Sequence, residues 1–133
     1  MFSSLFKYKD FALLIMRIGL GSMFLYHGYP KIMGGMEMWG KLGGAMSHIG
    51  VNFYPILWGF LASVAEFGGG LFLLFGFGTR IASFFLFTTM LIASISHMAN
   101  GDSLGDASHA LELTFIFFAM IILGPGKYSV DKK

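Results

Sequence analysis

Four stretches of this chain are apolar enough and long enough to cross a lipid bilayer, and they constrain its fold more than any other feature. They are residues 11–29, 56–78, 79–99 and 107–124. A membrane helix needs about 20 such residues, and a mean hydropathy of +0.72 sets the chain apart from soluble domains. Because backbone groups inside lipid must bond within the chain, each stretch is expected to be a helix. We therefore predict an all-α fold, with residues 1–133 forming one domain built on a four-transmembrane-helix bundle.

The distribution of positive charge predicts which way this bundle faces. One side holds both termini and the turn between the second and third spans. Its basic residues are Lys7, Lys9, Arg80, Lys127, Lys132 and Lys133. The other side has only Lys31 and Lys41, next to an outer loop of residues 30–55. Since cytoplasmic flanks of membrane helices carry the excess of lysine and arginine, we expect both termini to be cytoplasmic and the outer loop to lie on the membrane surface as a lid.

Composition excludes several classes of function. The net charge is +2, and no basic run is interleaved with aromatic residues, so we expect no nucleic-acid partner. The chain has no cysteine, which rules out disulfides, thiolate metal sites, iron–sulfur clusters and dithiol chemistry by the chain itself. Any electrons that pass through this protein must therefore come from a partner.

Two charged residues inside the spans need an explanation, because a charge at mid-bilayer costs about 2.5–3.5 kcal/mol. Glu66 shares its helix face with small residues, namely Gly59, Ala62, Ser63, Gly69 and Gly70. Small faces mark close helix packing in membranes, so Glu66 is expected to point inward. Arg17 shares a stripe with Gly21, Phe24, Gly28 and Lys31. We predict a buried Arg17–Glu66 ion pair, which either fixes helix register alone or also takes part in function.

Several polar residues map to the outer third of the membrane and suggest a ligand pocket. The candidate ligand-binding residues are His27, Lys31, Glu66, His97, His109 and Glu112. His109 and Glu112 are three residues apart, but a di-iron bundle needs two Glu-x-x-His pairs and two further glutamates, so we predict no metal. The alternative to a pocket is a capped helix start, with Glu112 hydrogen-bonded and the histidines satisfied by neighbouring groups.

Three segments carry a family resemblance. They are RIGLGSMFLYHGYPKI at 17–32, AEFGGGLFLLFGFGTR at 65–80 and GPGKYSVD at 124–131. Together they resemble the DoxX family of small four-helix bacterial inner-membrane proteins. The positions that match the family pattern are Arg17, Gly28, Lys31, Glu66, Gly69, Arg80, His97 and Tyr128. His27 fits the form of many members, whereas His109 and Glu112 belong to no family motif.

The resemblance implies an inner-membrane location and an association with redox metabolism. Relatives in the family include a subunit of a thiosulfate-oxidising enzyme that passes electrons to quinone, proteins linked to quinone or catechol stress, and members grouped with oxidative-stress complexes. For this chain it suggests a redox protein partner and a quinone as a non-covalent ligand. Such a resemblance predicts the fold of a protein better than it predicts its chemistry.

Three functions remain open on the sequence. The first is an accessory subunit of a redox or quinone-linked membrane system, which binds a quinone-like aromatic in the outer pocket and need not be an enzyme itself. The second is a small transporter or proton path that uses Arg17 and Glu66, for which a homo-oligomer is expected because four spans leave little room for a pore. The third is a non-catalytic scaffold or chaperone for partner membrane proteins, in which every buried charge is structural.

Overall fold

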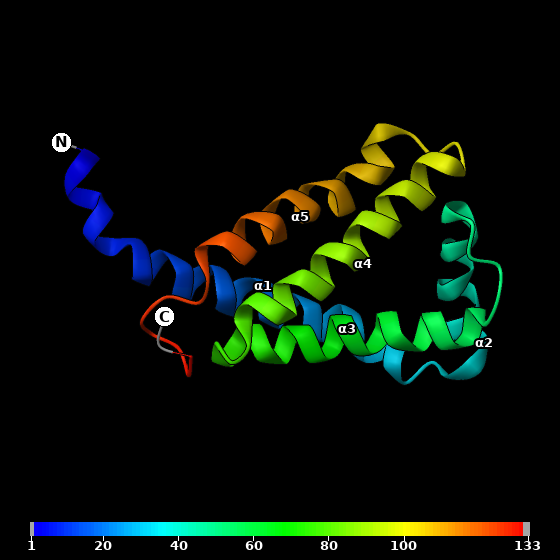
Figure 1. Ribbon diagram of the computed structural model, residues 1–133, viewed down its shortest axis with the longest axis horizontal. Coiled ribbons are helices and arrows are strands. Elements are labelled where there is room, and N and C mark those ends of the chain that lie inside the picture. The colour runs from blue at the N-terminus through cyan, green and yellow to red at the C-terminus, as the bar shows by residue number, and fades with distance from the viewer. Residues whose placement is uncertain (1, 132–133) are drawn as a thin grey trace.

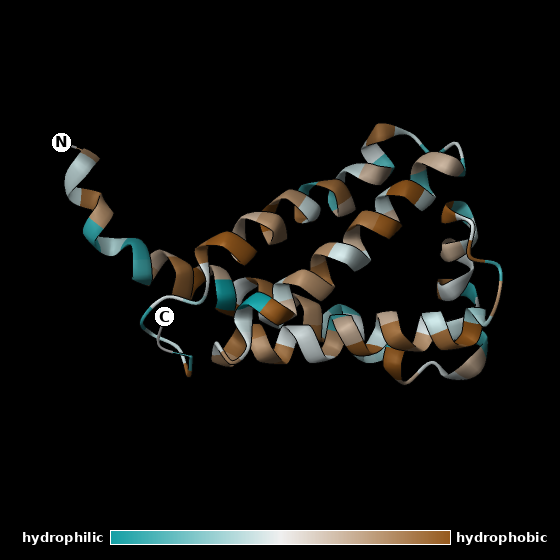
Figure 2. Cartoon of the chain, viewed as in Figure 1, coloured by the Kyte–Doolittle hydropathy of each residue, from teal (hydrophilic) through white to brown (hydrophobic). Residues whose placement is uncertain are grey.

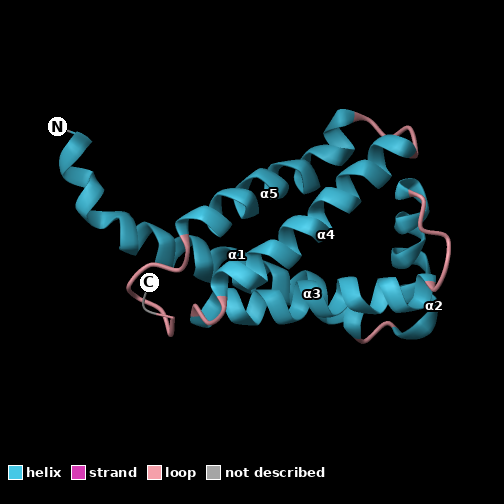
Figure 3. Cartoon of the chain, viewed as in Figure 1, coloured by secondary structure: helices cyan, strands magenta, loops and turns pink. Residues whose placement is uncertain are grey.

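The computed structural model describes residues 2–131, so Lys132 and Lys133, which contribute to the predicted orientation, lie outside it. Its elements are η1 (Phe2–Tyr8), α1 (Lys9–Ile32), α2 (Gly35–Gly43), η2 (Gly44–Ile49), α3 (Pro55–Phe75), α4 (Thr79–Ala99) and α5 (Leu104–Leu123). Within residues 2–131 there are helices, turns and loops but no strand (Figure 3). Four helices are long and apolar enough to span a membrane: Phe2–Ile32, Pro55–Phe75, Thr79–Ala99 and Leu104–Leu123. The predicted all-α bundle of four membrane helices is confirmed.

Local backbone chemistry sets where the spans begin and end. The α3 helix ends at Phe75, not at residue 78, because Gly76 and Gly78 both adopt left-handed conformations with φ of 71° and 56°. This makes the turn into α4 very tight. The α5 helix begins before residue 107, because the Ser103 side chain accepts a hydrogen bond from the Asp106 backbone N–H and so caps the helix.

The membrane helices form two close pairs. α1 packs against α3, α4 packs against α5, and α3 also contacts α4. From the α3–α4 turn the two pairs diverge toward the opposite end of the molecule (Figure 1). Much of the four long helices is coloured as hydrophobic (Figure 2), and many large apolar residues are exposed, including Phe115 and Ile122 of α5, which are 69% and 66% exposed. Such a surface is what a lipid environment requires.

Glycine allows α1 and α3 to approach each other at their backbones. A Cβ atom added to Gly21 would lie 2.7 Å from the Gly70 carbonyl oxygen, and one added to Gly28 would lie 2.7 Å from the Phe67 nitrogen. No larger residue fits at these positions without moving the helices apart. The small-residue face predicted around Glu66 is therefore a close helix contact, with Glu66 itself buried in it.

The two pairs are joined by larger side chains. Phe24 of α1 meets Phe117 of α5 edge to face, with 5.2 Å between ring centroids. Around them lies the core cluster of Phe24, Leu73, Leu86, Met90, Ala110, Leu113, Phe117 and Met120. Contact between α1 and α5 thus depends on side chains, in contrast to the backbone contact between α1 and α3.

The predicted outer loop contains two short helices that cross the far end of the bundle. α2 packs on α1 and α3, and η2 contacts α3 and α4 (Figure 1). Gly43 lies directly against the Pro55 backbone, and Gly59 lies directly against the Trp39 backbone. These contacts hold α2 in place. The segment therefore covers the far end of the bundle through backbone contacts, and its expected role as a lid stays a prediction.

Candidate functional site

The buried carboxylate of Glu66 is paired with Lys31. The Lys31 Nζ atom lies 2.8 Å from Glu66 Oε2 and 3.0 Å from Oε1, so both carboxylate oxygens accept from the ammonium group. Glu66 is only 5% exposed, whereas the Lys31 side chain is 32% exposed. The pair closes the far end of the α1–α3 contact and neutralises a carboxylate that α3 could not bury alone.

The predicted Arg17–Glu66 ion pair is wrong, and helix register explains why. α1 and α3 are antiparallel, and the contact of Gly28 with Phe67 places the next turn of α1, which carries Lys31, beside Glu66. Arg17 lies about 21 Å from Lys31 along α1, at 1.5 Å per residue. A guanidinium at that distance cannot reach Glu66.

Trp39 helps to position Lys31, and sequence reasoning missed it. The indole Nε1 donates to the Lys31 carbonyl oxygen at 3.0 Å. The same carbonyl oxygen also accepts from the Gly34 N–H at 3.2 Å, so the Trp39 bond is a second one, and it ties α2 to the end of α1. The Trp39 ring also packs edge to face on Phe60, with 4.9 Å between centroids. The aromatic residues of the outer loop were the feature of the sequence that could have indicated the contacts of Trp39.

A groove of about 950 Å³ lies beside the ion pair, between α1, α2 and α3. Its lining residues are Leu25, Tyr26, His27, Tyr29, Pro30, Lys31, Met38, Phe67 and Leu71. The walls are largely apolar and aromatic, and the Tyr29 and Phe67 rings lie 6.3 Å apart. Lys31 is the cationic group among the lining residues. An aromatic groove with a few convergent polar groups is the usual form of a small-molecule site.

The six predicted ligand-binding residues do not form one pocket. His27 and Lys31 line the groove, and Glu66 reaches it through Lys31. His97 Nδ1 instead lies 2.8 Å from Asp102 Oδ2, at the α4–α5 turn. His109 has its ring 6.3 Å from that of His27 but is exposed, as is Glu112. For His97 the reason is geometric, because α4 diverges from α3 toward this end (Figure 1), whereas His109 stays near His27 without lining the groove.

No metal cluster is found at these histidines. Within residues 2–131, no three histidine, aspartate or glutamate side chains gather closely enough to hold an ion. His109 and Glu112 thus lack a third ligand among the described residues, and the helix start that they occupy is capped by Ser103 rather than by Glu112.

Arg17 serves the opposite end of the bundle. It is fully buried, and its guanidinium donates to two carbonyl oxygens, that of Leu73 at 3.3 Å and that of Tyr128. Leu73 belongs to the last turn of α3, where the helix dipole favours a cation, and its carbonyl oxygen also accepts from the Gly76 N–H at 3.1 Å. Arg80 binds the end of α5 in a similar way, because its Nε donates to the Ile121 carbonyl oxygen at 3.1 Å. Both arginines are thus placed to complete helix ends.

The segment that Arg17 holds, residues 124–131, is called the strap here. Its Asp131 carboxylate accepts from the backbone N–H groups of Gly78 and Thr79 at 3.0 Å each, and so caps the start of α4. The Val130 and Asp131 nitrogens donate to Phe75 and Gly76 at 3.2 and 3.0 Å. Near its beginning, the Lys127 nitrogen donates to Asp10 on α1 at 3.2 Å. The strap therefore links α1, α3, α4 and α5 at the end that holds both termini.

The three segments that carry the family resemblance meet at two places in the structure: the Lys31–Glu66 pair and the strap held by Arg17. The first contributes Arg17 and Lys31, the second Glu66 and the α3–α4 turn, and the third the strap. Comparison with known proteins agrees, because residues 12–99 match the DoxX family.

The chain belongs to the DoxX family.

Among relatives in this family, inner membrane protein YqjF of Escherichia coli (strain K12) is 33% identical, with 95% of this chain and 94% of the relative covered. Inner membrane protein YphA of the same organism is 31% identical, with 96% and 97% covered. No solved structure matches the chain. Together with the four apolar helices, these relatives identify this DoxX protein as a multi-pass inner-membrane protein.

Proposed function

We propose that this DoxX protein is an accessory subunit of a redox membrane system and that it binds a quinone-like aromatic in the groove between α1, α2 and α3. The observation that carries the proposal is the position of the groove, whose aromatic walls stand directly beside the Lys31–Glu66 pair. A flat ring with polar oxygens needs both features. The aromatic walls bind its faces, and the cation binds an oxygen.

The chemistry of the pair suits such a ligand. An ammonium group has three N–H donors, and those of Lys31 reach two oxygens of Glu66, so a further N–H is available for a ligand carbonyl. Reduction of a quinone takes up protons, and ionisable groups next to the ring supply them. Lys31, Glu66 and His27 are the groups of that kind at this groove.

The remaining parts of the proposal concern the surroundings of the chain. The electrons come from a redox protein partner, since the chain has no cysteine with which to form a redox centre of its own. Both termini face the cytoplasm, which the lysines and arginines near the strap favour. The groove then opens near the outer surface of the inner membrane, and a role in oxidative stress follows from handling quinones there.

Mass spectrometry of the organic extract from protein purified in mild detergent tests this function. We expect a quinone to be enriched with the wild type and lost with Lys31→Gln and with Tyr29→Ala, which change the groove without removing the buried Arg17. His97→Ala is the matched control, because His97 lies outside the groove and should retain the ligand. Equal quinone content in all four proteins, or none in the wild type, would overturn the proposal.

A second function has one specific observation in its favour. Arg17 and Arg80 both bind helix-end carbonyls, and Glu66 has a lysine partner, so these charges have structural roles. This favours a scaffold or chaperone for partner membrane proteins. In that case no small molecule co-purifies, and one partner protein is recovered with the wild type in gentle detergent. The transporter hypothesis relied on an Arg17–Glu66 pair, and we do not retain it because that pair does not form.

A further inference from the structure

The first turns of the chain, η1, contain no buried residue. Among the residues that the structure describes, η1 packs only against the start of α1, and it extends beyond the bundle at the end that holds the strap (Figure 1). We propose that η1 is a surface anchor that lies in the headgroup region of an anionic leaflet, with its apolar side chains inserted among the lipids. This inference concerns the opposite end of the protein from the groove and does not depend on the proposed function.

Length shows that η1 does not belong to the span. The 24 residues of α1 cover about 36 Å, which already exceeds a hydrocarbon core of about 30 Å. At 2 Å per residue, the seven residues of η1 would add about 14 Å. α3, α4 and α5 have 20 or 21 residues and match the core without extension. η1 therefore emerges from the core, and it bends away from the line of α1 and runs steeply across the direction of α3 (Figure 1).

The side chains of η1 lie on three faces, one polar and two that carry large apolar residues. A 3₁₀ helix has three residues per turn, so residues three apart share a face. One face carries Phe2, Leu5 and Tyr8, which are 75%, 56% and 52% exposed; a second carries Ser3 and Phe6, of which Phe6 is 80% exposed; and the third carries Ser4 and Lys7. Exposing large apolar side chains to water to this extent is energetically unfavourable. A helix with apolar and polar faces is suited to the plane of the membrane surface.

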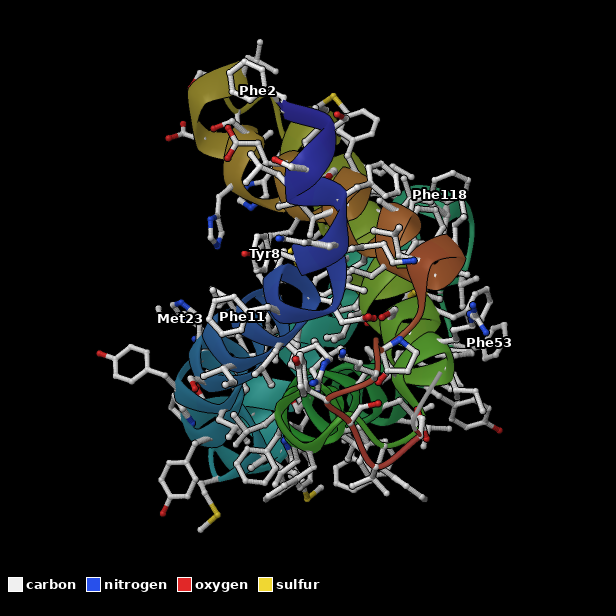
Figure 4. The ribbon with its side chains drawn as sticks, turned by 90° about the vertical axis from the view of Figure 1, so that its left-hand side faces the viewer. Phe2, Tyr8, Phe11, Met23, Phe53 and Phe118 are labelled. Carbon is white, nitrogen blue, oxygen red and sulfur yellow. The ribbon has the colours of Figure 1, made fainter. Side chains whose placement is uncertain are left out.

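The same end of the molecule carries the charge that an anionic leaflet attracts. Lys7 Nζ lies 5.1 Å from the centre of the Tyr8 ring, and Lys127 of the strap lies 5.2 Å from the centre of the Tyr128 ring. Both tyrosines are about half exposed. Two lysine–tyrosine pairs, one from each terminal region, thus stand at the end that holds the strap. Figure 4 looks onto this end of the molecule and labels Phe2 and Tyr8 of η1. Tyrosine rings favour the headgroup region of a membrane, and lysines there contact lipid phosphates.

Each lysine near such a surface strengthens attraction by about fivefold. Among residues 2–131, Lys9 and Arg80 join Lys7 and Lys127 at this end, and these four cations outnumber the two acidic residues there, Asp10 and Asp131. Charge and apolar character therefore point to one occupant, an anionic phospholipid surface, rather than to a second protein.

Spin labelling tests the anchor with the full-length chain, which has no cysteine to remove. A nitroxide is attached at Leu5→Cys on an apolar face or at Ser4→Cys on the polar face. Each protein is placed in nanodiscs of phosphatidylcholine with a minority of phosphatidylglycerol, and in nanodiscs of phosphatidylcholine alone. Accessibility to oxygen, which enters lipid, is compared with accessibility to a water-soluble nickel chelate.

We expect the Leu5 label to be accessible to oxygen and shielded from nickel in the anionic discs, while the Ser4 label shows the reverse. The shielding at Leu5 should fall in phosphatidylcholine alone and in a Lys7→Gln, Lys9→Gln background. Equal nickel access at both labels would show that η1 lies in water and would overturn the proposal. Shielding that does not change with lipid charge would overturn the anionic preference, and dipolar broadening between labels would assign the face to a second copy of the chain.

Discussion

Replacing Arg17 with methionine tests how the strap is held. Methionine fills the space of the arginine stem with apolar atoms but lacks the guanidinium that donates to Leu73 and Tyr128. Hydrogen bonds from a charged donor contribute about 1.5–3 kcal/mol each. With the lower value for each bond, because the Leu73 bond is long at 3.3 Å, Arg17→Met should reduce the free energy of unfolding by about 3 kcal/mol.

Only one of these two bonds involves the strap, which makes a double-mutant cycle informative. In a chain that ends after Gly124, the Tyr128 carbonyl is absent, so Arg17→Met should cost about 1.5 kcal/mol rather than 3. The coupling energy between Arg17 and the strap is then about 1.5 kcal/mol. Equilibrium unfolding by SDS from mixed micelles, followed by circular dichroism, measures all four proteins.

Arg80→Met is the control for this cycle. Arg80 is exposed and donates to Ile121 and Ile122 of α5, so its replacement should cost less. Independent sites add within about 0.5 kcal/mol. A coupling of Arg17 with the strap below that limit would refute the view that Arg17 holds the strap in place.

Three further predictions follow from the contacts described above. Gly28→Ala should destabilise the protein by about 2 kcal/mol because its methyl group would meet the Phe67 backbone, whereas Gly19→Ala, with nothing within 4 Å of the added carbon, should stabilise it by up to about 1 kcal/mol; thermal unfolding in detergent compares the two. Glu66→Gln or Lys31→Met alone should cost about 3 kcal/mol and the double variant less than the sum, and additive losses in denaturant titrations would argue against the ion pair. Asp131→Ala should cost about 1 kcal/mol by removing the cap of α4, with faster hydrogen exchange confined to the first turn of that helix, so unchanged exchange there would contradict the capping role.

The sequence predicted the helices and their inward faces because these depend on local pattern. Length and hydropathy located the spans, and the run of glycines around Glu66 correctly indicated a close contact. Glu66 was correctly expected to be buried. Its partner was not predicted correctly, because the choice between Arg17 and Lys31 depends on how α3 slides along α1, and only the Gly28–Phe67 contact fixes that register.

The arrangement of helices around the bundle also limited what could be predicted about the site. His27, His97 and His109 were assigned to one depth in the membrane, because the number of residues from each helix end can be counted in the sequence. Whether residues at one depth meet depends on the angle between helix pairs, and the divergence of α4 and α5 separates His97 from the groove. Asp131 caps α4 by hydrogen bonds between residues more than fifty positions apart. The local sequence pattern around either residue does not predict such a bond.

The bond from Arg17 to Tyr128 spans 111 positions and has a consequence for biosynthesis. The ribosome makes the first membrane helix before it makes the strap. Until the strap is made, the Arg17 guanidinium lacks the Tyr128 carbonyl oxygen as an acceptor. Translation must run almost to the end of the described chain before this group is satisfied. A product truncated before Tyr128 would therefore keep a buried cation in its first helix without that acceptor, and synthesis of the strap is the step that supplies it.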